Sequence, residues 1–186
     1  MPASNSQAAV GVARARGVRG VRGVRGVTLV EVLIVVIIIA IAAAMVVPRS
    51  GSADSVKVMS AARLLAADLA FAQLESVTKA DDPRRVVFDA DSNTYQIEAA
   101  SDPDTAITDP VSKKPYRVEF GKGRARELGG VSISGLSVGG DAALGFGLYG
   151  QTDQGTDATV TLRCGDATAV LTIAASSGEV GIAEGN

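Results

Sequence analysis

The sequence has no histidine, no tryptophan and a single cysteine, and only 4% of its residues are aromatic. Histidine is the usual general base and a common metal ligand, so its absence removes the commonest arrangements for acid–base catalysis and zinc binding. The chain also lacks the His-Glu-x-x-His pattern of metalloproteases. We therefore expect no enzymatic activity, no catalytic or metal-binding residue, no cofactor and no small-molecule substrate.

The lone cysteine, Cys164, cannot form a disulfide within the chain, so cysteine usage leaves the redox compartment undetermined. We expect Cys164 to be a small buried residue in a strand, with an intermolecular disulfide as the alternative.

Acidic residues are absent from the first 26 positions, which hold five arginines. The rest of the chain has 13 of the 18 basic residues and all 20 acidic ones, so its formal charge is −7. A basic tip before an apolar run is typical of a targeting segment, with the positive charge kept on the cytoplasmic side. Arg-Gly repeats also occur in RNA-binding tails, but an acidic body makes nucleic acid an unlikely main partner.

A long apolar run follows the arginines, from Val27 to Val47, and its only charge is Glu31. At about 1.5 Å per residue, a helix of that length crosses a hydrocarbon core of about 30 Å. We expect a transmembrane helix over 27–48, bent at Pro48. An amphipathic continuation of the helix is expected over 49–82, ended by Asp81-Asp82-Pro83.

The continuation is expected to present one charged face and one apolar face. The charged face consists of Asp54, Lys57, Asp68, Glu75 and Lys79, and the apolar face of Val58, Ala62, Leu65, Ala66, Leu69 and Val77.

From residue 83 to 186 the apolar period becomes two, which predicts an antiparallel β-rich domain. A hairpin is expected from 84–89 and 94–99, followed by a Pro- and Asp-rich loop over 101–115. Further strands are expected at 116–120, 131–138, 144–149, 158–164, 168–174 and 180–182. The fold class is α+β: a long N-terminal helix packed on an antiparallel sheet.

The position of Glu31 distinguishes among the glycines of the leader. Cleavage after Gly17, Gly20 or Gly23 leaves no acidic residue at the fifth position of the product, whereas cleavage after Gly26 puts Glu31 there. Cleavage after Gly26 also removes every arginine of the leader.

These features resemble the type IV pilin-like proteins. The stretch G-VTLVEVLIVVIIIAIAAAMVVP, residues 26–48, is similar to their processing site and anchor helix, although Val27 stands where phenylalanine is usual. AARLLAADLAFAQLESVTKADDPRRVVFDADSNTYQI, residues 61–97, resembles minor pseudopilins of the GspH/FimT type. A Phe/Gly turn at 146–150, a T-V-T-L-R strand and a closing S-G-x-V extend the resemblance through residue 182.

The resemblance implies specific roles for four residues. Prepilin peptidase would cleave the 1–26 leader after Gly26, and Val27 would become the new, N-methylated N-terminus. Glu31 would pair with the amine of a neighbouring subunit and set its stagger in a filament, and Pro48 would bend the helix.

The implied partners are other pseudopilin subunits, prepilin peptidase and the bacterial inner membrane. The 83–186 domain would lie in the periplasm, and the filament would be a type II secretion pseudopilus.

Three alternatives remain open from the sequence. The first is an ordinary signal peptide cleaved after Ala42-Ala43-Ala44, which would release a domain starting at Met45. The second is an uncleaved membrane anchor. The third is a type IV pilus minor pilin that takes part in DNA uptake, for which the candidate surface is Lys113, Lys114, Arg117, Lys122, Arg124 and Arg126.

Two further patterns favour ordinary structure over a ligand site. The GFGLYG stretch, 145–150, matches a nucleotide-binding Gly-x-Gly-x-x-Gly, but the residues after it predict a turn and a strand where that motif needs a helix. Asp102, Asp104 and Asp109 are oxygen ligands suited to calcium, and we expect them to be solvated carboxylates of a surface loop.

Overall fold

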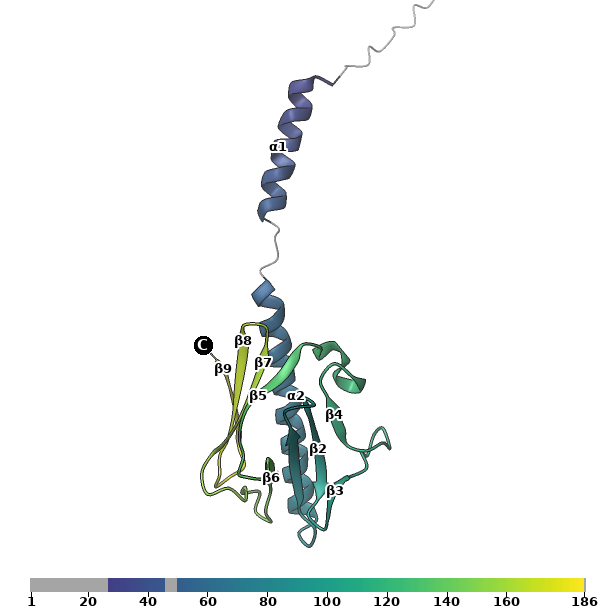
Figure 1. Cartoon of the computed structure of the whole chain (residues 1–186), viewed down its shortest axis with the longest axis vertical. Helices are drawn as coiled ribbons and strands as arrows, with labels where there is room; N and C mark the ends of the chain where they lie inside the picture. Colours follow the sequence, from purple (N-terminus) through teal and green to yellow (C-terminus); the bar gives the residue numbers. More distant parts are fainter. Residues whose placement is uncertain (1–26, 46–49, 186) are drawn as a thin grey trace, which may run out of the picture. The chain divides into compact units, whose positions relative to one another are not determined.

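The computed structural model describes residues 27–45 and 50–185, and the chain divides into two compact units, 1–47 and 48–186. In the first unit, α1 spans Leu29–Met45. The second unit, called the body below, contains α2, Ser50–Thr78, followed by the strands and one short 3-10 helix, η1, Gly123–Leu128. The α+β architecture expected from the sequence is confirmed (Figure 1).

The strands form two antiparallel sheets, where the sequence suggested one. The first has the order β3-β2-β1-β6, with β4 also paired to β2. Its strands are β1 Arg84–Asp89, β2 Thr94–Ala99, β3 Asp102–Ala106, β4 Arg117–Glu119 and β6 Ala143–Gly145. The second sheet has the order β5-β7-β8-β9, with β5 Val131–Ser137, β7 Ala158–Cys164, β8 Ala167–Ile173 and β9 Val180–Gly185.

The expected hairpin is confirmed at its predicted bounds, with Arg84 opposite Ala99 and Asp89 opposite Thr94. One strand was missed, because β3 lies inside the segment expected to be a loop. Its pairing with β2 is irregular, and its Asp-Pro-Asp start carries no strand propensity.

The core lies between α2 and the two sheets. Val58, Leu65 and Leu69 of α2 are fully buried against inward-facing strand residues such as Ile97 and Leu171. Alanines on the same helix face allow the strands to approach closely.

The expected faces of α2 are partly wrong. Val58, Ala62, Leu65 and Leu69 are buried as expected, and Ala66 is partly buried. However, Asp68, assigned to the charged face, is 3% exposed, whereas Val77, assigned to the apolar face, is 45% exposed. The solvent-facing stripe of α2 carries a single charge and consists of Val56, Ser60, Arg63, Ala67, Ala70, Leu74 and Val77.

The charged residues flank the buried face because they bind neighbouring elements of the body. Lys57 Nζ lies 3.4 Å from the carbonyl oxygen of Gly129, and a Glu75 carboxylate oxygen lies 3.8 Å from Nε of Arg84 in β1. Side-chain periodicity alone does not distinguish a solvated charge from one that contacts the next element.

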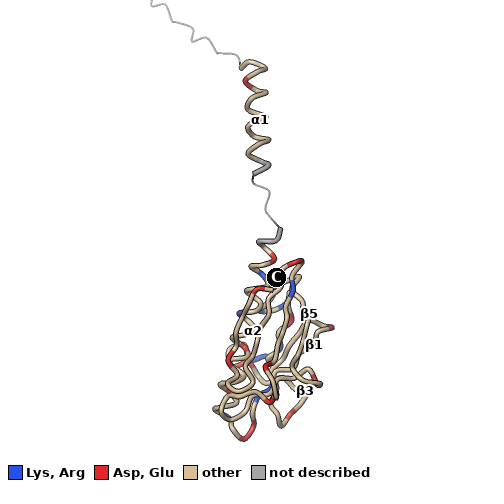
Figure 2. The backbone as a smooth tube through the Cα atoms, turned by 90° about the vertical axis from the view of Figure 1, so that its left-hand side faces the viewer, with Lys and Arg blue, Asp and Glu red and all other residues tan. Residues whose placement is uncertain are grey.

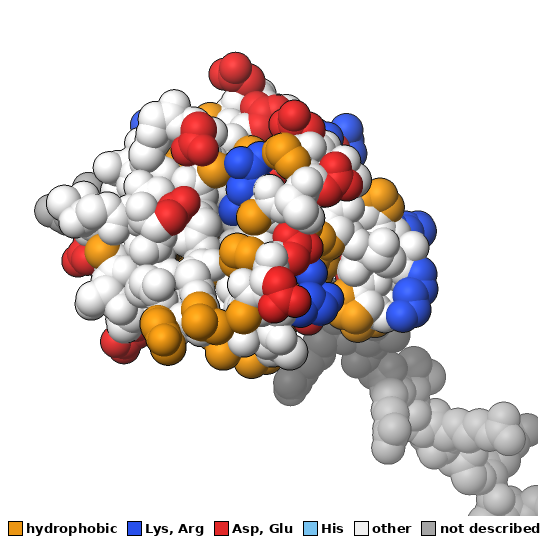
Figure 3. Space-filling model, turned by 90° about the horizontal axis from the view of Figure 1, so that it is seen from below, with side chains coloured by type: hydrophobic (Ala, Val, Ile, Leu, Met, Phe, Trp, Pro, Cys, Tyr) orange, Lys and Arg blue, Asp and Glu red, His pale blue; other side chains and the backbone are white. Residues whose placement is uncertain are grey.

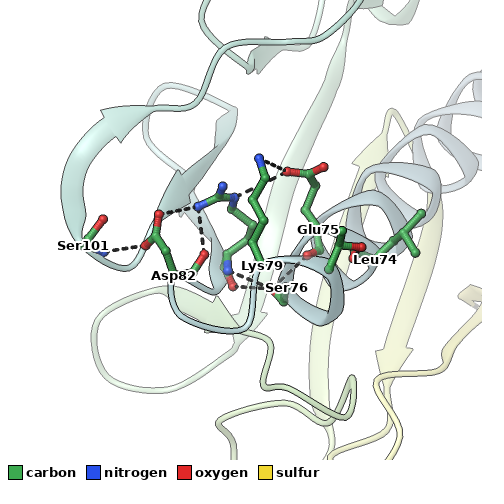
Figure 4. Close-up of polar contacts among 9 residues, drawn as sticks. Leu74, Glu75, Ser76, Lys79, Asp82 and Ser101 are labelled. Atoms are coloured by element: carbon green, nitrogen blue, oxygen red, sulfur yellow. Dashed lines mark hydrogen bonds and ion pairs between the residues drawn. The ribbon is translucent and has the colours of Figure 1, made fainter.

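Polar contacts join the end of α2 to β1 (Figure 4). Ser76 is buried, and its hydroxyl accepts the Arg84 backbone N–H at 2.7 Å and donates to the Ala72 carbonyl at 2.9 Å. Asp82 accepts from Arg84 Nη1 at 2.9 Å and from the Ser101 N–H at 3.1 Å. These contacts fix the direction in which the hairpin leaves the helix.

Candidate functional site

The first turn of α1 is closed by Thr28. Its hydroxyl accepts the backbone N–H of Glu31 at 3.2 Å, and its carbonyl accepts the N–H of Val32 at 3.2 Å. Thr-x-x-Glu at this position is the sequence of a capping box, and an acidic residue in the first turn interacts favourably with the helix dipole. The helix therefore begins directly after Thr28, with Val27 and Glu31 at the same end.

Apolar side chains cover α1 all the way round. Every residue from Val27 to Ala42 is exposed; Leu29 is 83% exposed and Ile39 60%. Figure 2 shows α1 without charge apart from one acidic position near its start, which is Glu31. A helix that is apolar on every side is stable only when lipid or protein covers it. Within residues 27–45 and 50–185, no helix is long and apolar enough to cross a membrane.

The predicted site residues divide between described and undescribed positions. Val27, 70% exposed, and Glu31 are described, whereas Gly26 and Pro48 lie outside the described residues. Ala42-Ala43-Ala44, the alternative cleavage site, is helical. The roles of Gly26, Val27, Glu31 and Pro48 in processing, assembly and bending stay predictions.

The body contains a buried polar cluster centred on Asp68. Tyr95 Oη donates to Asp68 Oδ2 at 2.5 Å, Tyr116 Oη donates to Oδ1 at 2.9 Å, and Arg124 Nη2 forms an ion pair with Oδ2. Phe71 stacks on the Tyr116 ring at 5.2 Å, and the Arg124 guanidinium lies 4.6 Å from the centre of that ring. The cluster joins α2 to β2, η1 and the segment before β4.

The ionisation of this cluster follows from its burial. Desolvation raises the pKa of Asp68 even though Tyr95, Arg124 and Tyr116 all favour its charged form. Burial and the neighbouring Asp68 carboxylate raise the pKa of Tyr116 to about 12. Both phenols therefore stay protonated and donate to the carboxylate at any physiological pH.

The expected basic surface is partly neutralised in the structure. Arg124 pairs with Asp68, Lys122 with Glu119 at 2.7 Å, and Arg126 with Glu127 at 2.9 Å. The neighbouring rings of Tyr116 and Phe120 are 7% and 8% exposed, so they offer little surface for stacking bases. On the face of the body shown in Figure 3, acidic and basic side chains lie interspersed.

The structure places the Gly-rich stretch at and after the end of β6, Asp102 and Asp104 in the exposed strand β3 where a loop was expected, and Asp109 in the loop after β3. The strand expected at 144–149 is mostly wrong, because β6 ends at Gly145; the residues after it form a turn, in which the Gly150 N–H donates to the Gly147 carbonyl at 3.0 Å, and the chain then leads to β7. The Asp109 carboxylate accepts from the Val111 N–H and the Ser112 hydroxyl, both at 2.8 Å, which lowers its pKa. Among the described residues, no group of three acidic, His or Cys side chains is arranged to hold a metal ion.

Cys164 lies in β7 and is 4% exposed, so its expected burial is confirmed. Burial raises the pKa of its thiol, which lies 3.5 Å from an Asp54 carboxylate oxygen.

Comparison with known proteins identifies the N-terminal segment. Residues 21–47 match the prokaryotic N-terminal methylation motif, the signal of type IV pilin-like precursors that prepilin peptidase processes. The matched range contains Gly26, Val27, Glu31 and the whole of α1. No curated protein and no solved structure matched the chain.

Proposed function

We propose that the chain is a minor pseudopilin of the GspH/FimT type, a non-enzymatic structural subunit of a type II secretion pseudopilus. In this proposal the leader is removed after Gly26, Val27 becomes the methylated N-terminus, and the whole apolar run to Val47 anchors the subunit in the inner membrane. The body then lies in the periplasm and contacts other subunits.

The observation that carries the proposal is the form of α1 within the matched motif. The helix is exposed and apolar on every side, and its one carboxylate lies in the first turn, beside the predicted new N-terminus. A helix that only anchors a protein gains nothing from a carboxylate, which is costly in lipid. A helix that packs beside identical or related helices gains a specific partner for it, because cleavage creates a cation on Val27.

The body is consistent with a subunit that binds other proteins. The solvent-facing stripe of α2 is apolar apart from Arg63, and Ser60 donates its hydroxyl to the helix backbone, to the Val56 carbonyl at 2.7 Å. The basic residues that a DNA-binding minor pilin would use are partly paired with acids. These features favour protein contacts over contacts with DNA.

The test is recruitment of Glu31 variants into the complex. Glu31→Gln removes the charge but keeps side-chain size, and Glu31→Leu also removes polarity. Both variants are expected to be cleaved and inserted, and to co-purify with partner pseudopilins at least about tenfold less than the wild type, because a charge pair shielded from water is worth a few kcal/mol.

Thr28→Val is the matched control, since it removes the hydroxyl that caps α1 and leaves the carboxylate in place. Recruitment of Glu31→Leu at the wild-type level would refute the assembly role.

A further inference from the structure

A groove of about 760 Å³ lies beside the Asp68 cluster. Ala67 and Phe71 of α2 belong to its helix wall and the loop 109–115 to its loop wall, and Tyr116 and Arg124 also line it. Because the stacked Phe71–Tyr116 pair and the Asp68–Arg124 ion pair fix these lining residues, the groove is formed before any ligand arrives.

More basic than acidic side chains line the groove. Lys114, Arg117 and Arg124 line it. Its two acids already have partners: Asp68 accepts from two phenols and Arg124, and Asp109 accepts from its own loop. Among the described residues, neither Lys114 nor Arg117 forms an ion pair, and the Arg117 side chain donates a single hydrogen bond, of 3.3 Å, to the Thr94 hydroxyl. The groove is thus a cationic feature of an acidic body.

The walls add apolar surface to this charge. Val111 is 88% exposed and stands between Pro110 and Ser112 on the loop wall, and Ala67 on the helix wall is small and exposed. Exposed aliphatic surface next to unpaired cations fits a ligand that carries both carboxylates and aliphatic side chains. The buried ring of Tyr116 leaves little face for a nucleobase, which favours a peptide over single-stranded nucleic acid.

We propose that this groove binds an extended segment of a partner protein in which acidic and aliphatic side chains alternate. Carboxylates of the segment pair with Lys114 and Arg117 at the edge, and its aliphatic side chains lie against Val111 and Phe71. This inference concerns the body, so it holds or fails independently of cleavage after Gly26 and of the pairing of Glu31.

The test uses the full chain, purified in dodecyl maltoside, and an array of hexapeptides in which acidic, basic, hydroxyl and aliphatic residues occupy every position in turn. Peptides that alternate Asp or Glu with Leu, Ile or Val are expected to bind, and their Lys counterparts are not. Lys114→Glu/Arg117→Glu should weaken binding by roughly tenfold, as expected for two partly exposed charge pairs. Ala67→Trp should abolish binding by filling the groove, without changing any charge.

Arg126→Glu/Arg163→Glu is the control, since it makes the same change in net charge at exposed positions outside the groove lining. Equal weakening by this control, equal binding of acidic and basic peptides, binding of no peptide, or displacement of the peptides by a single-stranded oligonucleotide would each overturn the proposal. Loss of binding in Ala67→Trp with retained circular dichroism would support it even if the charge-reversed variant failed to fold.

Discussion

At the scale of single residues, the body depends on two buried carboxylates, Asp68 and Glu98, of which the first was expected on the charged face of α2. Asp68 follows the helical period of the charged residues around it, yet its partners Tyr116 and Arg124 come from 48 and 56 residues further along the chain. Glu98 alternates with core residues on β2, yet it is 0% exposed and bonded to Arg85 and Gln96. Periodicity predicted both elements but carried no information on these long-range partners.

Replacing Asp68 with alanine should destabilise the body. Two buried phenols and a guanidinium lose their shared acceptor. Because Arg124 keeps access to water, we expect the free energy of unfolding to fall by about 2–3 kcal/mol, below the full cost of breaking a buried pair. Urea unfolding followed by tyrosine circular dichroism measures this, since all three tyrosines lie in the body. Asp109→Ala is the exposed control, and equal effects of the two would contradict the account.

Glu98 should make the stability of the body depend on pH. Burial opposes its ionisation, but hydrogen bonds from Gln96 and Arg85 outweigh burial, so its pKa lies below the ordinary value. A lowered folded pKa stabilises the fold above the unfolded pKa of about 4.3 and loses this contribution as the pH falls through the folded value.

Glu98→Gln should therefore cost about 1–2 kcal/mol at pH 7, and progressively less below roughly pH 4. The measurement is urea unfolding of both proteins between pH 3 and pH 7. If the difference in unfolding free energy between the wild type and Glu98→Gln grew as the pH fell, it would contradict the lowered pKa of Glu98.

At the scale of elements, α2 has three different sides. One side is buried against both sheets, the flanking charges bind neighbouring loops, and the outward stripe is apolar. Val56 and Leu74 on that stripe are 65% and 63% exposed. The faces of α2 predicted from periodicity were partly wrong because the prediction assumed that the chain buries its own apolar residues, whereas these apolar residues face outward. An outward stripe of this kind is what a helix needs when its partner is another protein.

The contact of α2 with two turns depends on Gln73 and Gly178. Gln73 Nε2 donates to the carbonyls of Gly150 and Ser177 at 2.8 and 2.7 Å. Gly178 has φ +68°, and a side chain there would overlap the Gly150 carbonyl and Gln73. Gly178→Ala should therefore lower the free energy of unfolding by about 3 kcal/mol, from backbone strain and lost hydrogen bonds.

Gly155→Ala makes the same chemical change at a position with nothing within 4 Å, so it should be nearly neutral in the same urea measurement. Similar stabilities for the two variants would show that the two turns adapt freely, and that Gln73 does not hold them.

At the scale of the whole molecule, the chain combines a body with its own core and an N-terminal helix without one. Strands such as β1 and β7 were predictable, because they bury alternate residues and are bounded by turn sequences, whereas β3, which is almost entirely exposed, was missed. The division of the strands into two sheets was not predictable, because residue alternation says nothing about which strands pair. For the N-terminal segment, the sequence is more informative than the structure. The order Gly26, Val27, Glu31 predicts where the segment is processed, and the structure adds the Thr28 cap and the exposed apolar surface of α1.

The central claim is that the chain is a prepilin-like precursor cut after Gly26, and the most direct test is the N-terminus of the protein extracted from membranes. Intact-mass measurement and N-terminal sequencing should find a chain that starts at Val27, and Gly26→Ala should leave the precursor uncut in the inner membrane. A mature chain that starts at Met45, or a wild-type protein that retains its arginine leader, would contradict the account.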